Sequence, residues 1–220
     1  MQTVYQVPLL LEQQGLVNLF KAALLLDKLT IPPALVDKGT ALWKLWNKTV
    51  LPKEHLERVD IAIVGKYVET HDAYLSVVKS LEHSAMRCHK DLHITWVDSE
   101  HLEDSTQDSE PSKYHQAWHV VCTTNGVVIP GGFGERGIEG MVKAASWTRT
   151  NRVPMLGICL GMQVAVIEAA RNLCGKKNAT SEEFESCSGE SVVIFMPEGS
   201  KTEKGGTMRL VYNPAQVLKS

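Results

Sequence analysis

The chain of 220 residues is 44% hydrophobic, which provides enough apolar material for one substantial core and a smaller accessory segment. Its formal net charge of −2 gives no electrostatic basis for binding nucleic acid or an anionic membrane. Five cysteines without CxxC spacing argue against a disulfide framework or a zinc site and favour reduced thiols in a cytoplasmic protein.

Residues 1–56 are the first segment of the predicted organisation. The spacing of apolar residues indicates a short strand before Pro8 and an amphipathic helix after it. The pair Pro32–Pro33 predicts a linker, and residues 41–50 predict a second helix with leucine and tryptophan on one face. This segment has too little core to fold alone, so we expect it to dock on another surface.

From residue 57 onward, apolar strands alternate with single helices. The first strand ends at Gly65 and is a continuous apolar run, which is typical of a buried parallel strand. The alternation predicts right-handed βαβ crossovers and a doubly wound, mostly parallel α/β sheet of the flavodoxin-like type over residues 57–220. The segment 99–112 is expected to be an acidic loop. We expect strands at 59–65, 92–98, 126–132, 153–159 and 191–197, and helices at 72–89, 114–121, 138–148 and 160–173.

The segment "GICLGMQ", residues 157–163, has the form G-x-C-x-G, the cysteine counterpart of a nucleophile elbow. A sharp strand-to-helix turn would expose the sulfur of Cys159, and glycines at 157 and 161 would let the helix cross the strand closely. The N–H of Leu160 would face a developing oxyanion, and the helix N-terminus would stabilise a thiolate. The alternative is a buried cysteine that closes an apolar strand. The pattern alone leaves both open.

The segment "PGGFGERG" contains a literal G-x-G-x-x-G motif at residues 132–137, between a strand and a helix. A dinucleotide site also needs an acidic residue at the end of the next strand, but that strand ends at Cys159. We therefore favour a second interpretation, in which Gly131 and Gly132 supply a further oxyanion donor beside the elbow. The simplest alternative is a tight turn that needs positive φ.

Other polar groups carry weaker signals. His71–Asp72 and Glu82–His83 are adjacent pairs whose side chains would point in different directions from a helix, so neither indicates a catalytic dyad. Composition alone indicates solvated carboxylates elsewhere. These are Glu100, Glu103, Asp104, Asp108 and Glu110 in the acidic loop, and Glu182, Glu183 and Glu185 beyond the elbow helix.

The motifs and their order resemble the CTP synthase family. "VYQVPLLLEQQG" looks like the end of that family's synthetase domain, and "IAIVGKYVETHDAYLSVVKSLEHSA" looks like the start of its glutamine amidotransferase domain. "PGGFGERGIEG", "GICLGMQVAVIEAARN", "NATSEEF", "MPE" and "GGTMRL" follow in the family's order. The resemblance implies a division into a synthetase tail and linker, residues 1–56, and an amidotransferase domain, residues 57–220.

The resemblance also implies site residues. The family aminates UTP to CTP with ATP, using ammonia that its amidotransferase domain releases from glutamine through a cysteine thioester. Cys159 would be the nucleophile, and Glu183 would receive the α-amino group of glutamine, because a carboxylate suits an ammonium. The remaining residues implied to bind glutamine are Gly132, Leu160, Gly161, Met162 and Gln163.

The chain also departs from the family pattern. The family's triad is completed by an H-x-E motif well beyond "GGTMRL", whereas the last histidine here is His119. The arginine-rich segment that contacts the glutamine carboxylate, and the phosphate loop and magnesium ligands of the synthetase domain, are not found either. We therefore expect the domain to be truncated after about residue 210, and the chain to be weak or inactive alone. ATP and magnesium would belong to the synthetase domain, and the glutaminase portion would need no cofactor.

The expected partners are glutamine, the synthetase domain or subunits of a full-length enzyme, and further copies in a homo-oligomer, with neither nucleic acid nor membrane. No signal peptide opens the sequence, and no apolar run approaches the roughly 20 residues of a membrane span. Two alternatives stay open. One is a noncatalytic glutamine-binding or assembly module of the same family, and the other is a flavodoxin-like small-molecule binder with a structural cysteine.

Overall fold

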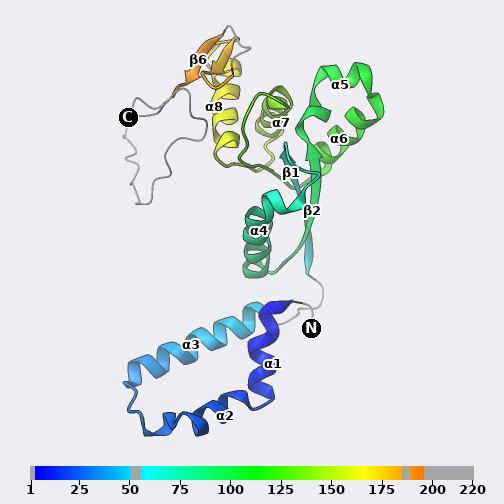
Figure 1. The fold of residues 1–220 in the computed structure, drawn as a ribbon. Helices are drawn as coiled ribbons and strands as arrows, with labels where there is room; N and C mark the ends of the chain where they lie inside the picture. Colours follow the sequence, from blue (N-terminus) through cyan, green and yellow to red (C-terminus); the bar gives the residue numbers. More distant parts are fainter. Residues whose placement is uncertain (1–2, 51–55, 185–188, 196–220) are drawn as a thin grey trace.

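The computed structural model describes residues 3–50, 56–184 and 189–195. Within them, three helices form an open arch, and a separate α/β unit begins at Glu57 (Figure 1). The division of the chain into two domains at residues 56 and 57 stays a prediction.

The arch is entirely helical, so the predicted strand before Pro8 is wrong. Pro8 lies in the first turn of a helix, where the proline ring fits because the N–H it lacks has no intrahelical partner there. The predicted second helix is confirmed, but it starts at Pro33, so this proline opens a helix instead of ending a linker. The elements are η1 (Val4–Gln6), α1 (Val7–Gln13), α2 (Leu16–Ala23), η2 (Leu26–Lys28) and α3 (Pro33–Val50).

A small aromatic joint connects the arch to helix α4 (Leu75–Cys88) of the α/β unit. The hydroxyl of Tyr5 lies 2.6 Å from Nε2 of His83, and the two rings meet edge to face. Trp46 donates a hydrogen bond from Nε1 to the carbonyl of Tyr5 at 3.2 Å. The joint therefore ties both ends of the arch to one helix.

The α/β unit contains a four-stranded parallel sheet in the order β2-β1-β3-β4. This confirms the predicted fold class. The strands are β1 (Glu57–Gly65), β2 (Lys90–Asp98), β3 (Gly126–Ile129) and β4 (Met155–Gly157). The remaining helices are η3 (His71–Tyr74), η4 (Ser99–Leu102), α5 (Asp104–Ser109), α6 (Pro111–Thr123), α7 (Ile138–Asn151) and α8 (Leu160–Asn172).

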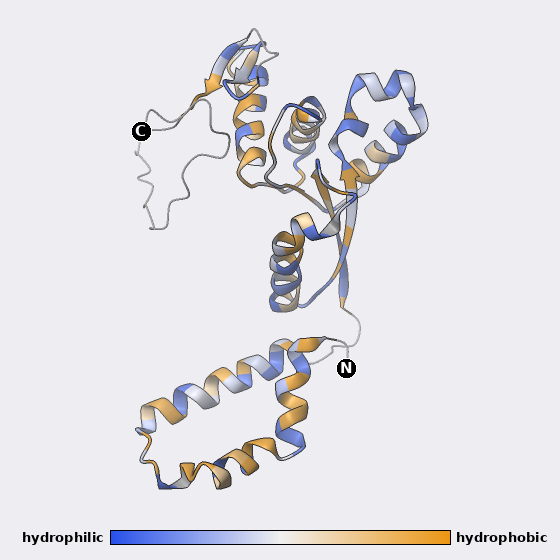
Figure 2. Cartoon of the chain, in the orientation of Figure 1, coloured by the Kyte–Doolittle hydropathy of each residue, from blue (hydrophilic) through white to orange (hydrophobic). Residues whose placement is uncertain are grey.

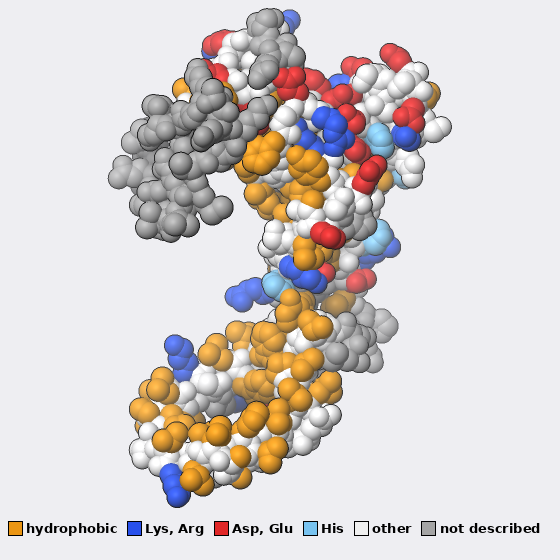
Figure 3. All heavy atoms as spheres, in the orientation of Figure 1, with side chains coloured by type: hydrophobic (Ala, Val, Ile, Leu, Met, Phe, Trp, Pro, Cys, Tyr) orange, Lys and Arg blue, Asp and Glu red, His pale blue; other side chains and the backbone are white. Residues whose placement is uncertain are grey.

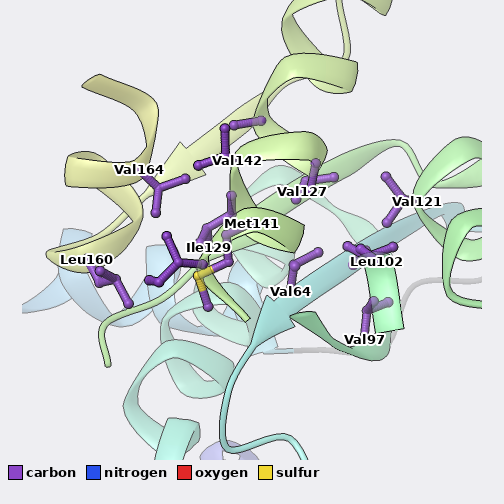
Figure 4. Close-up of a cluster of buried hydrophobic side chains, with 14 of the residues drawn as sticks. Val64, Val97, Leu102, Val121, Val127, Ile129, Met141, Val142, Leu160 and Val164 are labelled. Atoms are coloured by element: carbon purple, nitrogen blue, oxygen red, sulfur yellow. The ribbon is translucent and has the colours of Figure 1, made fainter. Parts of the chain in front are cut away.

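Alternate residues of the central strands enter two cores, one on each face of the sheet. Ala62 and Val64 of β1 join the larger core, which includes side chains from α6, α7 and α8 (Figure 4). Ile63 joins the smaller core with Val128 and Tyr74, against which α4 packs. Burial on both faces explains why β1 is a continuous apolar run and has no alternating pattern.

Two further sequence predictions, both for the α/β unit, differ from the structure. The expected fifth strand exists as β6 (Glu190–Val193), but it pairs in parallel with β5 (Ala179–Ser181) in a separate two-stranded sheet. An apolar run predicts a strand but not the strand with which it pairs. The partner here, β5, is short and polar, so the apolar pattern did not reveal it. The expected loop at 99–112 is mainly helical, and the carboxylate of Asp98 accepts a hydrogen bond from the N–H of Glu100 at 3.0 Å to start η4.

An ion pair between the exposed Arg149 and the buried Glu168 joins helices α7 and α8. Arg149 donates from Nε and Nη2 to Oε1 of Glu168 at 3.0 and 2.9 Å, and Asn172 donates to the same oxygen at 2.9 Å. Burial alone would raise the pKa of Glu168, but the hydrogen bonds from Arg149 and Asn172 outweigh it and lower the pKa overall. The two helices are therefore fixed against each other by a charged contact as well as by the core.

The arch exposes an extensive apolar surface, visible in the hydropathy and space-filling views (Figures 2 and 3). Leu19, Leu24 and Leu42 are 63%, 64% and 57% exposed. Among the described residues, no helix combines the length and the apolar character needed to cross a bilayer. Contiguous apolar surface of this kind favours association with another protein surface.

We expect the purified chain to self-associate through the arch. Replacing Leu19, Leu24 and Leu42 with lysine should lower the concentration-dependent association measured by sedimentation velocity, because apolar contacts drive it. A matched control places lysine at three exposed polar sites of the arch, Gln13 in α1, Asn18 in α2 and Thr40 in α3. Equal effects of the two sets would show that added charge, and not lost apolar surface, governs the association.

Candidate active site

Cys159 lies at the junction between β4 and α8, as the sequence predicts. Strand β4 ends at Gly157, and α8 begins at Leu160, with Cys159 as its N-cap residue. The backbone of Cys159 has φ 54° and ψ −106°, a region that side-chain-bearing residues rarely occupy and that costs on the order of 1–3 kcal/mol. The side chain is exposed. This conformation is that of a nucleophile elbow.

Two glycines make the elbow possible by close backbone contact. A Cβ on Gly157 would lie 2.5 Å from the carbonyl oxygen of Gly161, and a Cβ on Gly161 would overlap the carbonyl oxygen of Ile129. Ile158 also donates its N–H to the carbonyl of Ile129 at 2.9 Å. The elbow is therefore packed directly onto the end of β3, and both glycines of G-x-C-x-G are required by space.

The glycine loop, residues 131–134, lies beside Cys159, which confirms that the two glycine-rich turns are neighbours. A Cβ on Gly131 would lie 3.4 Å from Cβ and 3.9 Å from Sγ of Cys159. A Cβ on Gly132 would lie 3.4 Å from Cδ2 of Leu160. Both glycines of the loop therefore lie against the elbow, Gly131 against Cys159 and Gly132, the residue that the resemblance implies, against Leu160.

Backbone donors are available around the sulfur. In the described parts of the chain, the N–H groups of Gly131, Gly132 and Leu160 donate to no protein acceptor. Free N–H groups next to a nucleophile are what a developing oxyanion requires. The arrangement supports the predicted pairing of the elbow with the glycine loop.

Lys66 contacts the glycine loop through its side chain. It follows the last residue of β1, and its side chain is buried, with 3% exposure. Its Nζ donates to the carbonyl of Phe133 at 3.2 Å and to the carbonyl of Gly134. Burial lowers the pKa of Lys66 to about 8, although the charge of Glu183 opposes this shift.

Tyr67 and Glu183 hold the loop at further points. Phe133 donates its N–H to the hydroxyl of Tyr67 at 3.4 Å, and Gly134 donates its N–H to Oε1 of Glu183 at 3.4 Å. Glu183 is half-buried. The structure therefore brings this predicted substrate-binding carboxylate to the loop beside Cys159.

The predicted substrate-binding residues of α8 occupy three different environments. Gly161 is buried against Ile129, so its clear role is packing. Met162 is 58% exposed. The side-chain oxygen of Gln163 is buried and has no hydrogen-bond partner in the described residues. A buried acceptor without a donor calls for an explanation, and a bound ligand with an N–H group would supply one.

Glu82, His83 and two of the loop acids each have another partner in the structure. His83 belongs to the aromatic joint with Tyr5, and Glu82 pairs with Lys79 at 2.7 Å. Glu100 pairs with Arg136 at 2.9 Å, and Asp104 pairs with Lys143. Among the described residues, none donates to or accepts from Sγ of Cys159. Glu185, "MPE" and "GGTMRL" lie outside the described residues.

Sequence reasoning missed Lys66 and Tyr67. A signal for Lys66 was present, because a lysine directly after a buried apolar strand lies at the carboxyl edge of the sheet, where sites form in doubly wound folds. Its contacts with Phe133 and Gly134, however, join positions that are 67 and 68 residues apart. Spacing along the sequence could not predict them.

The chain was compared with known proteins. The sequence model of the family "Glutamine amidotransferase class-I" matches residues 69–220. CTP synthase of Neurospora crassa is 60% identical over 210 residues, which are 96% of this chain and 36% of that enzyme. CTP synthase 1 of Saccharomyces cerevisiae is 46% identical over 215 residues, 96% of this chain and 37% of that enzyme. The chain thus spans little more than a third of these relatives.

A solved structure is also similar. It is the Trypanosoma brucei CTPS glutaminase domain with bound acivicin, at a TM-score of 0.56 and 39% sequence identity. The similarity covers 68% of this chain and 54% of that chain.

The packing of the elbow generates a stability prediction. Gly161→Ala should lower the free energy of unfolding by about 1–3 kcal/mol, since its Cβ overlaps the carbonyl of Ile129 and the backbone must shift. Val166→Ala, at a 45% exposed site on the same helix, should change it by less than about 0.5 kcal/mol. Urea denaturation followed by circular dichroism measures both. Similar values for the two variants would contradict the close packing.

A second prediction concerns the burial of Lys66. Between pH 8 and pH 10.5 the unfolded chain binds more protons at this lysine than the folded chain, because the pKa falls from 10.5 to about 8 on folding. Stability must therefore rise with pH in this window. The unfolding free energy of the wild type should increase relative to Lys66→Met from pH 8 to pH 10.5. The exposed Lys177→Met controls for the loss of one positive charge, and a flat difference for Lys66→Met would refute the prediction.

Proposed function

The chain belongs to the class I glutamine amidotransferase family, and from this premise we propose that it releases ammonia from glutamine for a CTP synthase. In the proposed reaction, Cys159 attacks the side-chain amide of glutamine, and the ammonia passes to a synthetase domain that aminates UTP with ATP and magnesium. The similarity to CTP synthases over 96% of the chain supports this choice within the family. We also propose a cytoplasmic location and assembly with further subunits.

The observation that carries the proposal is the strained, exposed Cys159 at the start of α8. A cysteine kept only for packing needs neither a positive φ nor exposure of its sulfur. Strained backbone at a single non-glycine residue is typical of functional positions. The N–H groups of Gly131, Gly132 and Leu160, which donate to no acceptor within the described ranges, complete the arrangement.

The residues have distinct proposed roles in the acylation step. The sulfur of Cys159 forms a bond to the amide carbon of glutamine, and the amide oxygen becomes an oxyanion that accepts hydrogen bonds from the backbone of Gly132 and Leu160. Glu183 pairs with the α-ammonium group, and the buried oxygen of Gln163 accepts a hydrogen bond from the substrate. Met162 lies at the exposed side of the site.

Completing the reaction requires two proton transfers. The amide nitrogen must gain a proton so that the C–N bond breaks and ammonia leaves as the thioester forms, and water must then lose a proton to cleave the thioester. No histidine follows His119 in the sequence, and no described side chain hydrogen-bonds to Sγ of Cys159. We propose that this chain alone binds glutamine weakly and turns it over negligibly. The proposed chemistry of this portion uses no cofactor.

Covalent labelling tests the nucleophile, and an assay of ammonia release tests turnover. Acivicin, a chlorinated glutamine mimic, should modify Cys159 by forming a thioether and releasing chloride, as seen by peptide mass spectrometry. Cys159→Ala should abolish labelling, whereas Cys174→Ala, which removes another exposed thiol, should leave it unchanged. Ammonia release from glutamine should stay below a full enzyme's rate by about 10⁴-fold, the usual effect of a missing base.

Two results would oppose these expectations. Equal modification of all exposed cysteines would favour a structural cysteine and a flavodoxin-like binder. A robust Cys159-dependent release of ammonia would show that a base acts in this chain.

A further inference from the structure

We propose that Lys66 is a positioning residue for the amidotransferase site: its ammonium group fixes the peptides of Phe133 and Gly134 and so holds the glycine loop against Cys159. The inference deepens the proposed function and rests on it, because the loop must carry an oxyanion donor for its position to affect chemistry. Nothing in the arrangement places Lys66 in contact with the thiol.

The position of Lys66 in the sheet makes it a natural support. It follows β1, whose two neighbours in the sheet are β2 on one side and β3 on the other. In doubly wound folds, the crevice at such a change of strand order holds the ligand. Lys66 is 3% exposed, so its ammonium is shielded from water and donates to protein acceptors instead. The acceptors are the two loop carbonyls.

Lys66 and Glu183 together hold both ends of one peptide group of the glycine loop. The carbonyl of Phe133 and the N–H of Gly134 belong to the same peptide and point in opposite directions because the peptide is trans. Lys66 Nζ lies 3.2 Å from that carbonyl oxygen, and Oε1 of Glu183 lies 3.4 Å from that nitrogen. An ammonium and a carboxylate therefore hold the two ends of one peptide. Rotation of this peptide would break both contacts.

The aliphatic part of Lys66 supports the loop as well. A Cβ on Gly132 would lie 3.3 Å from Cδ of Lys66 and 3.4 Å from Cδ2 of Leu160. Gly132 is thus enclosed between the lysine stem and the first residue of α8, and Gly131 lies beside Cys159. Without this support, a movement of the loop by about 1 Å would shift its backbone N–H donors away from Cys159. Shifts of this size can lower a rate by about 10²-fold.

The backbone of Lys66 is itself held by two hydrogen bonds. Its N–H donates to the hydroxyl of Tyr74 at 3.2 Å, and its carbonyl accepts from Nη2 of Arg136. Arg136 also pairs with Glu100 at 2.9 Å. The loop is therefore connected through Lys66 to β1 and, through Arg136, to Glu100 of η4.

The test compares two reagents on the same thiol. Acivicin needs the aligned site, whereas iodoacetamide needs only an accessible Cys159. Lys66→Met should lower the limiting rate of acivicin modification by roughly tenfold to hundredfold and change the iodoacetamide rate by less than about twofold. Lys66→Arg, which keeps two donors, should restore part of the acivicin rate. The control is Lys79→Met, which removes an exposed lysine of α4.

The outcomes separate the proposal from simpler explanations. An unchanged acivicin rate in a folded Lys66→Met variant would overturn it, and so would equal slowing with both reagents, which indicates a general loss of structure. If Lys66→Met does not fold by circular dichroism, Lys66→Gln replaces it, since its amide keeps a donor in the buried position. Failure of the wild type to react with acivicin would overturn the proposed function, and this inference with it.

Discussion

The close crossing of α8 over the end of β3 is the contact on which the site depends. Gly161 packs on the carbonyl of Ile129, and Gly157 packs on the carbonyl of Gly161, with no room for a side chain at either position. The chain can make this crossing only by a sharp turn at Cys159, which leaves that residue at positive φ with its sulfur exposed. The same turn leaves the N–H of Leu160 without an acceptor among the residues that the structure describes.

Features that depend on local sequence were predictable. The continuous apolar run of β1 reflects burial on both faces of the sheet, and the G-x-C-x-G spacing reflects the crossing just described. The placement of the glycine loop beside Cys159 followed from one further rule, that consecutive parallel strands in such folds end at the same edge. These predictions need only the neighbours of each residue and the usual connection of strands and helices.

Features with an ambiguous local signal, and features that depend on distant partners, were not predictable. Helix formation at 99–112 was missed because serine and aspartate favour loops and helix caps alike. Strand β6 was assigned to the wrong sheet, because its partner β5 has only three residues and no apolar pattern. The buried oxygen of Gln163 and the contacts of Lys66 with the glycine loop appear only when the elements are assembled.

The ion pair between Arg149 and Glu168 has a consequence for how the site is formed. The glycine loop leads into α7, and the elbow leads into α8, so each half of the site is attached to one of the two helices that this pair joins. A contact between the two helices thus also holds together the two elements that follow the glycine loop and the elbow. A site preset in this way needs little reorganisation when charge develops on a substrate, and electrostatic preorganisation of this kind is commonly the largest contribution to catalysis.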